Sequence, residues 1–381
     1  MINFSNDLNE RINASNEKWD TDCAAEILVA NANVLEYFEK GMACQRYVPP
    51  RWESEGMKIS WRNKLTRRVR LRSKYQQMTG DLVAATKSGL QLLRFGKMIL
   101  DGSNCIYEWR GGNAYEKSAL EHLEEIVADA RTPESALREI LAELERWDPA
   151  GMVAGCKNAM RGQYQGKVQT IREVMKGGRY HDIPDSARYI PYLLKPNMTS
   201  RYMVAFYRHQ IVCADLPYAK ITSKYRWRAP EELEKNLDCW FRPNSAGMVF
   251  FEHENWRVGD EMGEQESRCF IQAWISALQL KTSLRLYEIK HGKLPDDLHA
   301  LVPEFLRDVP VDPFADKPFR YSKDRRLVWS SGPDGSDDEG SGESWNENSL
   351  ILTGNYYNKD LVMPLGTREL KPNLAPKPSV P

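Results

Sequence analysis

The sequence has little of what most enzymes and disulfide-rich scaffolds carry. Its seven cysteines lie at least 21 positions apart in 381 residues, so there is no Cys-x-x-Cys zinc or redox motif and no basis for a disulfide framework. Six histidines leave few groups for acid–base chemistry or metal binding. The phosphate-binding loop, the dinucleotide fingerprint, the His-Glu-x-x-His zinc motif and the Gly-x-Ser-x-Gly elbow are all missing. The sequence therefore predicts no reaction.

Charge of one sign and long apolar runs are missing too. Lys and Arg number 53 and so do Asp and Glu, so no net field recruits nucleic acid or anionic lipid. No stretch approaches the roughly 20 apolar residues of a membrane helix. The first 20 residues lack the basic start and apolar run of a signal peptide. Two alternatives stay open, a cytoplasmic protein and a protein from which an upstream anchor was removed.

What is present, in a chain with 41% hydrophobic residues, is mostly helical periodicity. Residues 1–179 predict an all-α domain of helical hairpins. One hairpin spans 60–98 with its turn at Gly80-Asp81 and resembles a tetratricopeptide hairpin, although no repeat at a fixed period follows. Thr132-Pro133-Glu134 predicts a helix start with the Thr132 hydroxyl as the cap.

The second half predicts a different organisation. Residues 180–264 contain several prolines and are expected to form an irregular and partly helical connection. Residues 265–291 predict a helix of about 40 Å. Short strands are expected at 318–321 and 327–329, and 350–352 is a candidate third strand. The module 265–365 would therefore place a long helix over an antiparallel sheet of two or three strands, with 366–381 as a proline-rich tail. The predicted fold class is mainly α with a small α+β module.

One ordered motif set lies in residues 284–335. Its matching positions are Tyr287, His291, Gly292, Pro295, Leu298, Leu301, Val302, Asp312, Pro313, Phe314, Pro318, Phe319, Tyr321, Ser330, Gly332, Asp334 and Gly335. This set resembles the C-terminal half of the type II secretion major pseudopilin. The rest of the chain is similar to a family of bacterial envelope proteins in which a helical N-terminal region precedes the same module, and to which no activity is assigned. The resemblance implies a bacterial envelope or periplasmic location if an upstream anchor was removed.

The resemblance also implies a calcium loop. In major pseudopilins the loop after Ser-x-Gly-x-Asp-Gly binds calcium, a cation that takes six to eight oxygen ligands. The candidate ligands here are the Ser331 carbonyl with Asp334, Asp337 and Asp338. The acidic pair that the family has before its last strand is replaced by Asn348-Ser349. The alternative interpretation is a solvated acidic turn.

Other patterns carry less chemistry. A basic run extends from Arg62 to Lys74, but its charges fall on several faces of a helix, so we expect a solvated or salt-bridged helix face rather than a nucleic-acid surface. His209 and Cys213 share a helical face as half a metal site would, and Glu288 lies one turn before His291. For these side chains, and for His181-Asp182, a structural role is favoured.

The sequence therefore favours a non-enzymatic scaffold or interaction protein of the bacterial cell envelope. Its partner would be another protein or a second copy of the chain, and nucleic acid is not expected. Calcium is the one cofactor suggested. The alternative is a hydrolase whose site lies at the interdomain surface.

Overall fold

A computed structural model describes residues 19–44, 55–176, 195–221, 263–341, 343–344 and 360–367, with side chains from Arg62 onward in the helix that begins at 55. The helices of these parts are α2 (Thr21–Ala30), α3 (Ala32–Met42), α4 (Glu55–Met78), α5 (Leu82–Gly102), α6 (Ile106–Ala128), α7 (Glu134–Leu144), α8 (Pro149–Met175), α9 (Pro196–Cys213), the short η3 (Tyr218–Lys220), α12 (Gly263–His291) and the short η6 (Leu298–Leu301). The strands are β1 (Val311–Asp312), β2 (Lys317–Pro318), β3 (Arg320–Ser322), β4 (Leu327–Ser330), β5 (Glu343–Ser344) and β6 (Leu361–Pro364).

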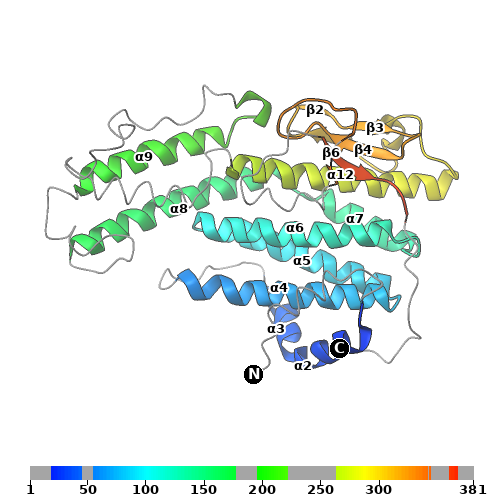
Figure 1. Ribbon diagram of the computed structural model, residues 1–381, viewed down its shortest axis with the longest axis horizontal. Helices are drawn as coiled ribbons and strands as arrows, with labels where there is room; N and C mark the ends of the chain where they lie inside the picture. The colour runs from blue at the N-terminus through cyan, green and yellow to red at the C-terminus, as the bar shows by residue number, and fades with distance from the viewer. Residues whose placement is uncertain are drawn as a thin grey trace.

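The helices lie in layers that end in a sheet. α2 and α3 pack on α4, α4 packs on α5, and α5 and α6 share the most extensive helix contact. α12 lies on α6 and α7, and it carries β4 and β6 on its other side (Figure 1). α8 and α9 pair with each other and extend beyond the hairpin layers. The predicted fold class, mainly α with a long helix over a small antiparallel sheet, is confirmed.

The main sheet has the order β3-β4-β6-β5. β3, β4 and β6 are antiparallel, and the two-residue β5 joins β6 in parallel. β1 and β2 form a separate antiparallel pair. The expected third strand at 350–352 lies outside the described residues, and the strand that completes the antiparallel sheet is Leu361–Pro364.

Short polar signals set several helix ends. Gly80 adopts a φ of +91° in the predicted turn, and the Asp81 carboxylate accepts the Ala84 N–H at 3.0 Å to start α5. Asp148 caps α8 in the same way, with Pro149 as the first helical residue. The predicted cap at Thr132 is wrong. Its hydroxyl donates to the Ile126 carbonyl at 2.6 Å and so closes α6, while α7 begins without a side-chain cap.

The main core runs through both parts of the chain. One continuous cluster of buried apolar residues extends from Trp19 through the hairpin helices and α12 to Leu365. A second cluster joins α8 and α9 to the facing ends of α5 and α6. Within the described residues, no helix is both long and apolar enough to span a membrane. The domain boundaries at 179 and 264 fall at or next to segments outside the described residues and stay a prediction.

Candidate functional site

The acidic loop, residues 331–341, lies on the face of the sheet that is turned away from α12. Side chains alternate along the strands, so Val328 and Met363 belong to the main core while Leu327, Trp329 and Val362 form a separate small cluster. Gly340, at a φ of +68°, lies so close to this cluster that an added Cβ would come within 3.1 Å of Trp329 and Leu327. The loop therefore covers the outer apolar cluster of the sheet.

Basic and aromatic side chains hold the loop in place. Arg325 donates to the carbonyls of Glu339 and Gly340, the latter at 2.8 Å. Asp337 accepts the Trp329 indole N–H at 3.0 Å and pairs with Arg320 at 2.8 Å. The hydrogen bond and charge of Arg320 lower the pKa of Asp337. These contacts with Trp329 and Arg320 give Asp337 a structural function in the loop.

The structure describes all four predicted calcium ligands but does not gather them. Ser331 is buried, and its backbone N–H and hydroxyl donate to Asp312, which also binds Ser330. Asp334 is exposed and accepts the Ser336 N–H at 3.0 Å, and Asp338 is exposed as well. No three His, Cys, Asp or Glu side chains of the described residues lie close enough together to hold a metal ion.

The sequence reasoning missed Asp360, which directly precedes β6. Its side chain is fully buried; Oδ2 accepts the Gly340 N–H at 2.7 Å, and the backbone N–H of Asp338 also interacts with the carboxyl group. Burial raises its pKa, and the charges of Asp337 and Asp338 raise it further. An apolar run preceded by an acidic residue was the available signal, since Asp360 stands before Leu361-Val362-Met363.

Asp360 is a further candidate ligand for the calcium hypothesis. Asp360, rather than Asn348-Ser349, directly precedes the last described strand, and the charges of Asp337 and Asp338 act on its carboxyl group. A buried carboxylate beside two other carboxylates is of the ligand type that a hard cation prefers. Asp337 is already paired with Arg320, so a calcium ion that binds Asp337 would have to displace the Arg320 guanidinium.

The other side chains considered for acid–base chemistry, where the structure describes them, contact neighbouring side chains. Cys213 Sγ lies 3.5 Å from His209 Nε2 on α9, with no further ligand gathered there among the described residues. Glu288 forms a two-point ion pair with Arg326 at 2.8 Å, and His291 stacks on Tyr287 with ring centres 4.2 Å apart. His181-Asp182 lies outside the described residues.

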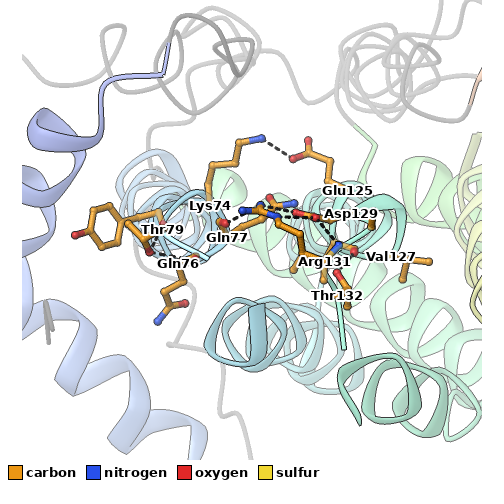
Figure 2. A network of polar contacts seen from close by, with 12 residues as sticks. Lys74, Gln76, Gln77, Thr79, Glu125, Val127, Asp129, Arg131 and Thr132 are labelled. Atoms are coloured by element: carbon orange, nitrogen blue, oxygen red, sulfur yellow. Dashed lines mark hydrogen bonds and ion pairs between the residues drawn. The ribbon is translucent and has the colours of Figure 1, made fainter. Parts of the chain in front are cut away.

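The basic run of α4 ties helices together. Arg62 pairs with Glu108 at 2.9 Å, Arg70 with Glu121, Arg72 with Glu39 and Lys74 with Glu125. Figure 2 shows the end of this network, where Lys74 of α4 reaches Glu125 of α6. Beside it Arg131 binds Asp129 through two nitrogens and donates to the Gln77 carbonyl (Figure 2). The expectation of ion pairs along this run is therefore met at these four positions.

α12 is attached to the hairpin helices along its whole length. Near its start Glu264 accepts from Arg110 at 3.0 Å. In its middle Lys281 forms a buried ion pair with Glu124 at 3.2 Å. Near its end Arg285 donates to the carbonyl of Val127 in the last turn of α6 and to those of Ala130 and Thr132 between α6 and α7. The sheet and the acidic loop are thus mounted on a helix that the hairpin layers hold.

A pocket of about 800 Å³ lies where the helical layers meet the C-terminal module. Its walls come from the first half of α8, the turn after α9, α12 and the segment from β1 to β2. The lining that the structure describes contains no histidine. The combination of histidine and carboxylates that a hydrolase site would need is therefore not found in that lining.

Comparisons of the chain with protein-family models, with curated proteins and with solved structures returned no match.

Proposed function

We propose that the protein is a non-enzymatic scaffold of the bacterial cell envelope, which presents its pseudopilin-like module and acidic loop to a protein partner or to a second copy of the chain. The observation that carries the proposal is the attachment of α12. One helix is fixed to α6 and α7 by Lys281 and Arg285 and carries the sheet on its other side. A rigid mount of this kind reduces the conformational entropy lost when a partner binds.

The loop is the surface we expect to meet the partner. Residues 334–339 are exposed, and within them Asp337 is paired with Arg320 and the Glu339 carbonyl accepts from Arg325. A photo-crosslinking amino acid in place of Ser336 should give one discrete adduct in cells of the native host. The same amino acid in place of the exposed Glu145, after α7, is the matched control and should give none. Equal adducts, or none at either position, would contradict the scaffold proposal.

Calcium binding by the loop is the second part of the proposal. The buried carboxyl group of Asp360, on which the charges of Asp337 and Asp338 act, supports it, although these three side chains are not gathered closely enough to hold an ion without a movement of the loop. Asp360 and Asp337 would supply side-chain oxygens to the ion, and calcium would hold the loop on the sheet. Because protons compete for the same carboxylates, the affinity should increase with pH above the ordinary aspartate pKa of about 3.9.

Calorimetric titration of the full chain with calcium tests this part. Loops of modest affinity bind calcium at about 10⁻⁴ to 10⁻³ M, and tenfold excess over the Kd should raise Tm by about 2–4 °C. Asp360→Asn should remove the heat and the Tm shift, and Asp324→Asn, an exposed carboxylate in the β3–β4 turn, should retain both. Absence of heat and of a Tm shift at millimolar calcium would refute calcium binding and leave the scaffold proposal standing.

The alternative, a hydrolase at the interdomain surface, has no support from the described histidines. His122 is the most enclosed of them, and it lies beside Glu125 at 3.6 Å inside the α4–α6 network. Burial lowers its pKa and keeps the side chain out of reach of a substrate. Hydrolysis of ester or peptide substrates by the purified full chain would favour this alternative.

A further inference from the structure

The pocket between α8, α12 and the segment after β1 is lined by a cation that no described residue neutralises. Arg268 of α12 is one of its lining residues and is only 7% exposed. Its Nε–H is buried without a hydrogen-bond partner, and the guanidinium forms no ion pair with any described residue. A buried charge is costly unless an opposite charge or several hydrogen bonds compensate it.

Other buried cations of the described chain are compensated. Arg62, Arg72, Lys74 and Lys281 each lie within 3.2 Å of a carboxylate oxygen. Arg268 departs from this pattern, because it has no carboxylate partner among the described residues. It also lines a pocket of about 800 Å³. A guanidinium that has no carboxylate partner among the described residues and lines a pocket can bind an anionic ligand there.

The remaining lining limits the charge and shape of that counterion. Lys157 and Arg161 of α8 also line the pocket, as do Asp215 and Asp316, so the charged lining carries one net positive charge. Lys157 is already paired with Asp215, and Arg161 donates to Asn158 at 2.9 Å. A ligand with a single negative charge therefore balances the pocket, and Arg268 is the buried lining cation without a carboxylate partner among the described residues.

Most of the remaining wall is apolar, and Asn158 and Gln272 are among its uncharged polar residues. Val153 of α8, Leu216 and Pro217 after α9, and Val311 with Pro313 of the β1 segment all line the pocket. Val311 is 49% exposed, so part of its apolar surface is open to a ligand in the pocket. Pockets of roughly 300–1,000 Å³ with an apolar wall and a few polar anchors are typical of small-molecule sites.

We propose that this pocket binds a small organic carboxylate, with the carboxylate on the Arg268 guanidinium and an apolar body against Val153 and the residues after α9. Planar guanidinium and carboxylate groups form two parallel hydrogen bonds, so Arg268 sets the orientation of the ligand. The site lies at the junction of the helical layers and the C-terminal module, apart from the acidic loop. Binding there does not depend on calcium or on a protein partner.

The experiment uses the full chain with benzoate and octanoate as probes, and benzamide and octanamide as their neutral counterparts. At about 10 mM, a probe that binds should raise Tm, and calorimetry should then give its Kd. We expect binding of at least one carboxylate and no binding of its amide. Arg268→Met should weaken that binding at least tenfold, whereas Arg146→Met, which removes an exposed arginine at the end of α7, should leave it unchanged.

Two further readouts separate a ligand site from a structural role of Arg268. Removing an uncompensated buried charge should leave the Tm of the free protein unchanged or higher, whereas loss of a structural contact would lower it. Val153→Trp fills the pocket without altering Arg268 and should also abolish binding. The proposal is overturned if neither carboxylate binds, if the amides bind equally well, or if Arg268→Met and Val153→Trp both bind the probe as the unaltered chain does.

Discussion

Single residues decide how closely the central helices approach each other. An added Cβ at Gly96 would lie 2.6 Å from the Glu116 side chain, and one at Gly112 would lie 2.7 Å from Leu100. At Gly89 it would lie 2.9 Å from Leu123. Glycine is otherwise unfavourable inside a helix, so its presence at these crossings between α5 and α6 reflects close packing. The same packing encloses polar groups such as Glu116, whose two carboxyl oxygens have no partner.

The neighbouring glycines 111 and 112 of α6 allow a direct test of this packing. Gly112→Ala should destabilise the protein by about 1–3 kcal/mol, because the new methyl group meets Leu100. Gly111→Ala has only Tyr115 nearby, at 3.8 Å, and should be neutral or stabilising by up to about 1 kcal/mol through helix propensity. Urea denaturation measures both variants. Equal effects of the two substitutions would show that α5 and α6 are not in close contact here.

Glu116 makes stability depend on pH. Burial raises its pKa well above the usual range, so the folded chain binds this proton more tightly than the unfolded chain. The contribution of Glu116 is therefore most favourable at or below the ordinary Glu pKa of about 4.3, and it is lost as pH increases toward the folded-state pKa. Glu116→Gln should raise Tm at pH 8 by about 2–4 °C and have little effect near pH 4.

The control for this prediction is Glu145→Gln at an exposed position after α7, which should leave Tm unchanged at both pH values. If Glu116→Gln lowers Tm at pH 8 and not at pH 4, the ionised carboxylate has a charged partner in solution and the interpretation is wrong.

At the scale of elements, the sequence predicted the extent of the α12 helix but did not predict its partners in the interior. The periodicity of 265–291 predicted its extent within a few residues. It did not predict that Lys281 and Glu124 pair in the interior, because their separation of 157 positions carries no local signal. The basic run of α4 is similar: its charges were visible in the sequence, whereas their carboxylate partners on α3 and α6 were not.

The Lys281–Glu124 ion pair should hold α12 on α6. Lys281→Met leaves Glu124 buried without this cation and should cost about 3–5 kcal/mol. Glu124→Met should cost a similar amount by leaving the ammonium uncompensated. The double variant should be more stable than the sum of the single effects predicts, because neither charge is left unpaired. A double-mutant cycle in urea measures the coupling, and strictly additive effects would show that the two groups do not interact.

The main core joins the hairpin layers to the C-terminal module. Apolar side chains from α2 to β6 belong to one cluster, and α12 contributes to it from the C-terminal half of the sequence. The hairpin layers and the sheet each contact a different side of α12. Loss of either neighbour would expose an apolar face of this helix to water.

We therefore expect the hairpin layers and the C-terminal module to unfold together. Calorimetry should show a single main transition that includes both parts, and Trp329 in the sheet should report the same midpoint as the far-ultraviolet signal of the helices. Two well-separated transitions would show that α12 detaches before the hairpin layers unfold.

The sequence by itself determined most of the helices, the hairpin turn at Gly80-Asp81 and the β3–β4 pair, since periodicity and capping act over a few residues. It also indicated the acidic loop. Only the tertiary structure decided that Asp337 pairs with Arg320, that Asp360 lies beneath the loop and that Arg268 borders a pocket without a counterion. These relations depend on distances between segments far apart in the chain. Such distances follow from how the helices and strands pack together, and local residue patterns do not encode them.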